Sequence, residues 1–269
     1  MTNMINSGEY QKRREERLKT SKPVNNKQRN RGAVTFLDVL GWKGIWRDEK
    51  NDDTGENAKD RLSRFIKEIE KQAKEIVLKY SFNKLEDKTL EVDQQYSLNK
   101  LERGKNFEVE LLSISDTIVF FTSGSAQDAI SIHCELCAWT LNNALKKGFP
   151  LRGAIGYGVY DHDESIMIGP AVDEAASWHE STDWIGVVLS PSVYFELERK
   201  LPKCAVEYSK IPYKKGVKGT NWCVDWNYGN AENNYKEICA AFSNRGPHMQ
   251  EVAPKYLNTL DFLTREMNN

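Results

Sequence analysis

Two aspartates occupy positions where a carboxylate needs a chemical explanation. Asp38 interrupts the otherwise apolar run 33–41, where a buried carboxylate is costly unless it is paired or bound to a metal. Asp116 lies between two apolar runs, 107–113 and 117–121, which together predict a hairpin. Carboxylates that converge repel each other, and a divalent cation such as Mg²⁺ or Mn²⁺ relieves that repulsion. Aspartate is also a common turn residue, so Asp116 alone is more readily explained as structural.

The hydrophobic periodicity predicts elements that would bring these aspartates together. A strand carrying Asp38 precedes an amphipathic helix over 62–77, in which apolar residues recur at spacings of three and four. The hairpin around Asp116 then leads to a helix over 126–147 and a strand over 151–159. This order predicts an α+β fold with a ferredoxin-like βαββαβ sheet and helices on one face. In such a sheet the first strand lies beside the hairpin, so the two carboxylates converge.

The chain divides into three expected parts. Residues 1–31 carry nine Lys and Arg against three Glu and almost no apolar residues, which predicts a disordered basic tail. Residues 32–228 form the expected catalytic domain, and 229–269 a helical extension packed on it. The later elements expected are helices over 170–180, 191–199, 231–243 and 250–266, strands over 184–189, 204–208 and 221–226, and loops over 47–59 and 81–106.

Composition excludes several function classes. Hydrophobic residues make up 39% of the chain and charged residues 29%, which is typical of a soluble globular protein. The formal net charge of -1 gives no indication of a nucleic-acid or membrane partner, and no run approaches the ~18 apolar residues of a membrane helix. Five scattered cysteines favour reduced thiols in the cytoplasm. Cys134 and Cys137 form a CxxC pair without a second pair, so we interpret them as core residues of a helix.

Four segments, in order, resemble the catalytic pattern of the class III adenylate and guanylate cyclases. They are Phe36–Gly41, Ser113–Ile118, Leu151–Gly158 and Ile168–Ala176. Together with Trp184–Pro191, they resemble more closely the pyrimidine cyclases of the bacterial antiphage Pycsar systems. The resemblance covers roughly residues 33–225, and the ordered set carries it rather than any single motif.

The resemblance implies two-metal catalysis between two subunits of a homodimer. Asp38, the Val39 carbonyl and Asp116 would hold two Mn²⁺ or Mg²⁺ ions, while the ribose 3′-oxygen attacks the α-phosphorus and pyrophosphate leaves. The residues expected at the nucleotide are Leu40, Gly41, Trp42, Lys43, Arg152, Lys215 and Lys218. For Lys215 and Lys218, a solvated charged loop is the competing interpretation. We expect neither a membrane nor a nucleic acid as partner.

Departures from the adenylate cyclase pattern argue against ATP and are consistent with a pyrimidine base. Adenylate cyclases place a base-reading Lys six residues before the second Asp, where this chain has Glu110. The position of the partnering acidic residue is Pro170. The Asn and Arg of the later helix are replaced by Asp173 and Ser177, so the usual transition-state Arg is missing from its place. We therefore expect conversion of UTP or CTP to cUMP or cCMP, a second messenger that a separate effector senses in antiphage defence.

Three alternatives remain open. The first is a purine cyclase that acts on ATP or GTP. The second is an inactive cyclase-like nucleotide-binding module, which Ser177 favours and the retention of both aspartates opposes. The third is a nucleic-acid-binding protein that uses the basic tail, whose binding would weaken with added salt.

Overall fold

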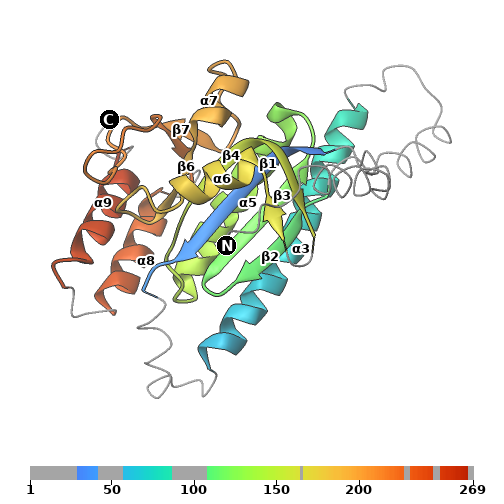
Figure 1. Ribbon diagram of the computed structural model, residues 1–269. Helices are drawn as coiled ribbons and strands as arrows, with labels where there is room; N and C mark the ends of the chain where they lie inside the picture. The colour runs from blue at the N-terminus through green and yellow to red at the C-terminus, as the bar shows by residue number, and fades with distance from the viewer. Residues whose placement is uncertain are drawn as a thin grey trace, which may run out of the picture.

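The computed structural model describes residues 29–41, 57–86, 108–163, 166–226, 231–244 and 249–265. The strands are β1 (Asn30–Val39), β2 (Glu110–Ile114), β3 (Thr117–Ser123), β4 (Leu151–His162), β5 (Met167–Ile168), β6 (Gly186–Leu189), β7 (Ala205–Glu207) and β8 (Trp222–Val224). The helices are α3 (Ala58–Glu86), α5 (Ala126–Lys146), α6 (Pro170–Trp178), α7 (Pro191–Glu196), α8 (Ala231–Ser243) and α9 (Ala253–Leu263). They form the mixed α+β fold that the sequence predicts (Figure 1).

A sheet with strand order β2-β3-β1-β4-β6-β8-β7 forms the centre of the molecule, and β5 pairs with β4. Strand β1 is antiparallel to both neighbours, pairing with β3 over 32–38 and with β4 over 30–39. Strands β4 and β6 are parallel, and the connection between them contains α6. The hairpin β2–β3 therefore lies directly beside β1, as the βαββαβ order predicts.

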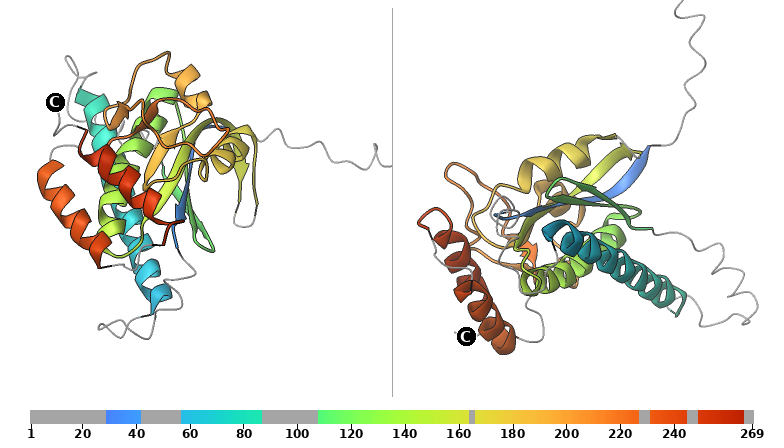
Figure 2. Two further views of the ribbon diagram at one scale, coloured as in Figure 1. Left: turned by 90° about the vertical axis from the view of Figure 1, so that its left-hand side faces the viewer. Right: turned by 90° about the horizontal axis from the view of Figure 1, so that it is seen from below.

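Helices cover both faces of the sheet, which corrects the prediction that they lie on one face. Helices α3 and α5 pack on one face, around a core that includes Leu37, Phe65 and Phe120. Helix α6 lies on the other face, where Ala171 and Ala175 pack with residues of β1 and β3 (Figure 2). Because α3 and α5 already fill the first face, the apolar side of α6 is buried on the opposite one.

A glycine in β4 lets α6 lie close to the sheet. A Cβ on Gly156 would stand 3.0 Å from the carbonyl oxygen of Ala171 and 3.3 Å from the amide nitrogen of Ala175. Since no side chain separates helix and strand at this point, α6 runs directly over β4. Its C-terminal end thereby reaches the end of β1 that carries Asp38.

Several element boundaries differ from the predicted ones. Helix α3 continues to Glu86, so residues 81–86 are helical and not part of a loop. Helix propagation is cooperative, so it continues after the regular apolar spacing ends at Val77. Strand β1 begins at Asn30, inside the range expected for the tail, and the two-residue strand β5 was not predicted. Helix α3 begins at Ala58, inside the loop expected over 47–59. Residues 1–28, 42–56 and 87–107, which contain most of the expected tail and of the two expected loops, lie outside the described residues.

Helix α9 is joined to the segment that enters β6. The side chain of Thr259 accepts a hydrogen bond from the amide of Ile185 at 2.9 Å, and Asn258 donates to the carbonyl of Asp183 at 2.8 Å. The Arg265 guanidinium lies 2.6 Å from an Asp225 carboxylate oxygen, next to β8. Side chains at the C-terminal end of the chain therefore join α9 to the segments that flank β6 and β8. None of the helices that the structure describes is both long and apolar enough to cross a bilayer.

Candidate functional site

Asp38 is the penultimate residue of the central strand β1. Its Cα lies opposite Thr117 of β3 on one side and opposite Arg152 of β4 on the other. Side chains alternate between the faces of a strand, so Asp38 shares the α6 face with Phe36, two residues earlier. Its side chain is 13% exposed. Pairing on both sides thus holds the carboxylate at the rim of the sheet with only a small part open to solvent.

Asp116 lies at the tip of the neighbouring hairpin and is joined to β1 by a backbone hydrogen bond. The amide of Val39 donates to the carbonyl oxygen of Asp116 at 3.0 Å. The preceding residue, Ser115, has a φ of 59°, a left-handed conformation that closes the two-residue turn between β2 and β3. Asp38, near the end of β1, and Asp116, in the adjoining hairpin turn, therefore lie at the same edge of the sheet.

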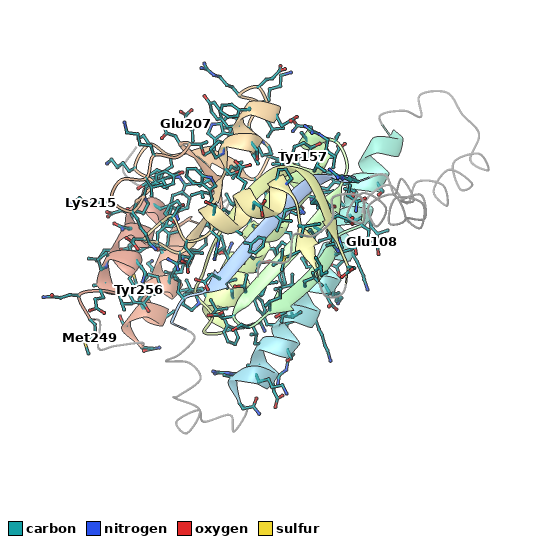
Figure 3. The ribbon with its side chains drawn as sticks, in the orientation of Figure 1. Glu108, Tyr157, Glu207, Lys215, Met249 and Tyr256 are labelled. Carbon is teal, nitrogen blue, oxygen red and sulfur yellow. The ribbon has the colours of Figure 1, made fainter. Side chains whose placement is uncertain are left out.

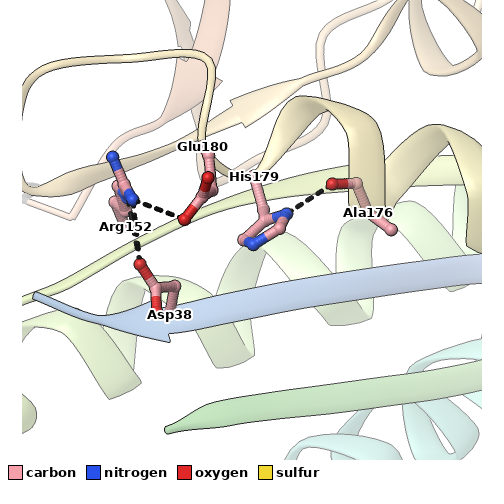
Figure 4. Close-up of polar contacts among 5 residues, drawn as sticks. All are labelled: Asp38, Arg152, Ala176, His179 and Glu180. Carbon is pink, nitrogen blue, oxygen red and sulfur yellow. Dashed lines mark hydrogen bonds and ion pairs between the residues drawn. The ribbon is translucent and has the colours of Figure 1, made fainter. Parts of the chain in front are cut away.

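Arg152 is the cationic partner of Asp38. Its Nε and Nη2 atoms each donate to Oδ2 of Asp38 at 3.1 Å, and Nη2 also donates to Oε1 of Glu180 at 2.9 Å (Figure 4). The side chain of Arg152 is 9% exposed, whereas that of Glu180 is 56% exposed. The sequence predicts that Arg152 meets phosphates, and here its hydrogen bonds go to two carboxylates. Such pairing compensates a buried guanidinium that would otherwise be costly.

The turn after α6 carries Glu180 to the site. His179 is the C-terminal cap of this helix, and its Nδ1 donates to the carbonyl of Ala176 at 2.5 Å. The His179 ring also lies against Phe36 of β1, with ring centroids 5.8 Å apart. The sequence gives Glu180 no role, because its contact with Arg152 exists only once α6 crosses over β1 and β4. The opposed positions of Asp38 and Arg152, in contrast, follow from aligning the two strands.

Leu40 and Gly41 form the turn that leaves β1. The amide of Leu40 donates to the carbonyl of Pro150 at 2.8 Å, and Gly41 has a φ of 76°, which glycine adopts without strain. Both residues line a small cavity of about 90 Å³, together with Pro150 and residues of α9 that include Lys255 and Tyr256. Trp42 and Lys43, the next two residues expected at the nucleotide, lie outside the described residues.

Lys215 and Lys218 lie on the loop between β7 and β8. Lys215 is exposed at the periphery of the molecule (Figure 3). Lys218 lines a hollow of about 350 Å³ with Trp222 and with residues that follow the C-terminal end of β6. Arg152 pairs with Gly186 at the N-terminal end of β6, so within one copy of the chain Lys218 lies at the opposite end of that strand.

A buried histidine connects the strands on the α5 face of the sheet. Nδ1 of His133 lies 2.6 Å from the Thr35 hydroxyl on β1, and Nε2 lies 3.0 Å from the Thr122 hydroxyl on β3. Burial lowers the pKa of His133 to about 3, so the ring is neutral at pH 7. Cys134 and Cys137 are buried in the same helix, as predicted, and burial raises the pKa of both thiols.

The oxygen donors of this edge fit a hard divalent cation. Carboxylates of Asp38 and Asp116 and a main-chain carbonyl at Val39 are ligands that Mg²⁺ and Mn²⁺ accept. Within the described ranges, both hydrogen bonds to Asp38 go to Oδ2, and Oδ1 accepts none. No group of three or more His, Cys, Asp or Glu that could hold a metal occurs in that part of the chain. A cation here would therefore take its remaining ligands from phosphate oxygens and water.

No known family profile matches the chain, and curated proteins give no match either. Adenylyl and guanylyl cyclase domains are among the solved structures to which it is similar. The adenylyl cyclase CyaB from P. aeruginosa is 16% identical, with a TM-score of 0.41 over 73% of this chain and 94% of that one. The dimeric guanylyl cyclase domain of the RhoGC fusion protein from Blastocladiella emersonii is 14% identical, with a TM-score of 0.37 over 66% and 89%. The GTP-bound guanylate cyclase domain of RhGC from Catenaria anguillulae is 14% identical, with a TM-score of 0.36 over 72% and 96%. At scores this low, we base the functional proposal on the residues of the chain.

Proposed function

We propose that this protein is a nucleotidyl cyclase that converts UTP or CTP to the 3′,5′-cyclic monophosphate and pyrophosphate. The observation that carries the proposal is the hydrogen bond from the Val39 amide to the Asp116 carbonyl, because it joins the end of β1, which carries Asp38, to the hairpin turn that carries Asp116. In the reaction, the ribose 3′-oxygen forms a bond to the α-phosphorus while the α–β bridging bond breaks. Pyrophosphate leaves, and the hydroxyl proton passes to water.

The proposed roles follow from the positions of the side chains. Asp38 and Asp116 would hold two Mn²⁺ or Mg²⁺ ions, which stabilise negative charge on the attacking and leaving oxygens when they are bound. Pairing of β1 on both sides fixes Asp38 before the substrate arrives, and such preorganisation lowers the barrier to an internal displacement. Arg152 contributes positive charge beside the Asp38 carboxylate, where phosphate oxygens would gather.

Two positions argue against ATP and are consistent with a pyrimidine base. Glu110 begins β2, and its carboxylate lies 3.4 Å from Nε2 of His162. Pro170 is the first residue of α6, and it has neither a side-chain hydrogen-bonding group nor a backbone N–H. The adenylate cyclase pattern places a Lys and an acidic residue at these two places, so this chain lacks the donor–acceptor pair that would read adenine. A purine triphosphate remains the competing substrate.

The experiment that tests the proposal offers the purified protein each of the four nucleoside triphosphates with Mn²⁺ or Mg²⁺. Cyclic products and pyrophosphate are measured by liquid chromatography with mass spectrometry, and the Asp38→Asn variant is the control. We expect cUMP or cCMP from the wild type. Cyclic AMP or cyclic GMP as the sole product would overturn the pyrimidine assignment. Triphosphate binding without any cyclic product would overturn the enzymatic proposal, and the exposed Ser177 in place of an arginine would then explain the inactivity.

We also propose that the active form is a homodimer and that the product is a messenger for a separate effector in antiphage defence. The dimer is supported by the exposed side of α6, where Asp173 and Ser177 lie one turn apart at the positions of the cyclase helix motif. The biological role is supported by the sequence resemblance alone. Light scattering after size-exclusion chromatography tests the dimer, and a monomer that retains full activity would contradict it.

A further inference from the structure

The Arg152 cluster consists of Asp38, Arg152 and Glu180, and its two carboxylates differ in their surroundings. Asp38 is held on the central strand with its side chain 13% exposed, whereas Glu180 lies on the turn after α6 with 56% exposed. Arg152 touches both, and its Nη2 atom is shared between them at 3.1 and 2.9 Å (Figure 4). One cation is therefore shared between a largely buried carboxylate and an exposed one.

The proposed cation site creates a conflict within this cluster. A divalent ion on Asp38 would lie a few ångströms from the Arg152 guanidinium, and the two positive charges would repel each other strongly at that separation. Arg152 is nearly buried, so it cannot leave Asp38 for bulk water without losing its compensation. A metal ion at Asp38 therefore requires another anionic partner for Arg152 close by.

We infer that Glu180 is a positioning residue that takes over Arg152 when Asp38 binds a cation. The inference rests on the proposed function, because it assumes the metal role of Asp38. Glu180 already forms an ion pair with Nη2 through one hydrogen bond, so a small side-chain shift would give it a second hydrogen bond to the guanidinium. Its exposure leaves it free to follow the guanidinium, and its charge offsets that of Arg152 beside the metal.

The first test measures the affinity of the full chain for Mn²⁺, by titrating MnCl₂ and following the free ion by electron paramagnetic resonance. We expect Glu180→Gln to weaken Mn²⁺ binding about tenfold, a typical effect of losing a group that supports a metal ligand. Glu180→Asp, which keeps the charge, should recover part of the loss. Glu75→Gln is the matched control, because Glu75 on α3 has a similar exposure, 57%, and pairs with Lys71 instead. It should bind Mn²⁺ like the wild type.

The second test asks whether Glu180 acts through Arg152. We expect Arg152→Gln to bind Mn²⁺ more tightly than the wild type, because the competing cation is gone. Adding Glu180→Gln in that background should then change the affinity by less than about twofold. A tenfold loss in both backgrounds, or no loss in the wild-type background, would overturn the inference. Far-UV circular dichroism of each variant verifies that it is folded.

A third variant separates failure of the inference from failure of the proposed function. Asp38→Asn should abolish the Mn²⁺ binding that the wild type shows. If it does, while Glu180→Gln binds normally, only the role of Glu180 is wrong. If Asp38→Asn binds Mn²⁺ like the wild type, or the wild type shows no binding that depends on Asp38, the metal assignment itself fails and the role of Glu180 fails with it.

Discussion

Arg152 and Asp38 lie directly opposite each other on β4 and β1, and the guanidinium donates two hydrogen bonds to a single carboxylate oxygen. The residue proposed to bind a cation thus has a positively charged partner from its own chain. A carboxylate that is compensated in this way does not need a metal ion in order for the chain to fold. Metal binding and folding should therefore be separable in this protein.

Removal of divalent ions should leave the fold intact. We expect the melting temperature in excess EDTA to equal that of the protein in metal-free buffer, as measured by circular dichroism. Mn²⁺ should raise the melting temperature, because a ligand that binds only the folded state stabilises it by mass action. The Asp38→Asn variant should lose this Mn²⁺-dependent increase. Unfolding of the wild type by EDTA would show that the metal is structural instead.

Asp116→Asn should separate chemistry from stability. Asparagine is as well suited to a hairpin turn as aspartate, so the free energy of unfolding should change by less than about 0.5 kcal/mol. An amide is a poor substitute for a carboxylate at a divalent ion, so we expect cyclase turnover to fall by about 10³-fold or more. Product formation and urea unfolding are measured on the same preparation. Asp60→Asn, at an exposed position in the first turn of α3, is the control and should retain full turnover.

Acidification should destabilise the protein through His133. Burial lowers the pKa of this side chain from 6.5 to about 3, so the unfolded chain binds the proton more readily than the folded one. The neutral, buried His133 therefore contributes its full stabilisation above pH 6.5, the pKa in the unfolded chain. That stabilisation is lost as the pH falls toward the pKa of about 3 in the folded protein. Between pH 6.5 and 5 we expect a loss of about 2 kcal/mol. Urea unfolding at several pH values checks this, and an equal loss in His133→Gln would rule out the assignment.

Gly156→Ala should push α6 away from the sheet. The added methyl group would meet the Ala171 carbonyl at 3.0 Å, and neither the helix nor the strand can yield without a backbone shift. We expect a destabilisation of about 1–3 kcal/mol, the usual cost of overpacking, measured by urea unfolding. Ser177→Ala, on the exposed side of the same helix, should change stability by less than about 0.5 kcal/mol. If Gly156→Ala left the free energy of unfolding unchanged, α6 would not be packed tightly against β4.

The order of the elements and the position of the aspartate pair were predictable from sequence because both depend on short-range signals. The apolar run around Asp38 and the two runs flanking Asp116 identify a strand and a hairpin. Once these elements are in sequence order, the topology of the sheet places them side by side. The metal and nucleotide roles of these residues stay predictions.

The features that were not predicted depend on how elements pack in three dimensions. The apolar side of α6 is visible in the sequence, but its choice of face depends on which surface α3 and α5 leave open. The contact between Arg152 and Glu180 depends on that choice, because residues 152 and 180 meet only when α6 crosses β1. Strand β5 is too short, at two residues, for any alternation to be recognised.

Because side chains alternate between the two faces of β1, the α6 face receives Asp38 only in the observed register. A register slip of one residue would turn the Asp38 carboxylate toward α5, into the layer that Leu37 and Val39 now occupy. An insertion or deletion in this strand would thus bury a charge among aliphatic side chains while it removed the acid from the rim. A change in the length of β1 would therefore cost both stability and the proposed activity, whereas the loops that connect the strands can vary in length without either cost.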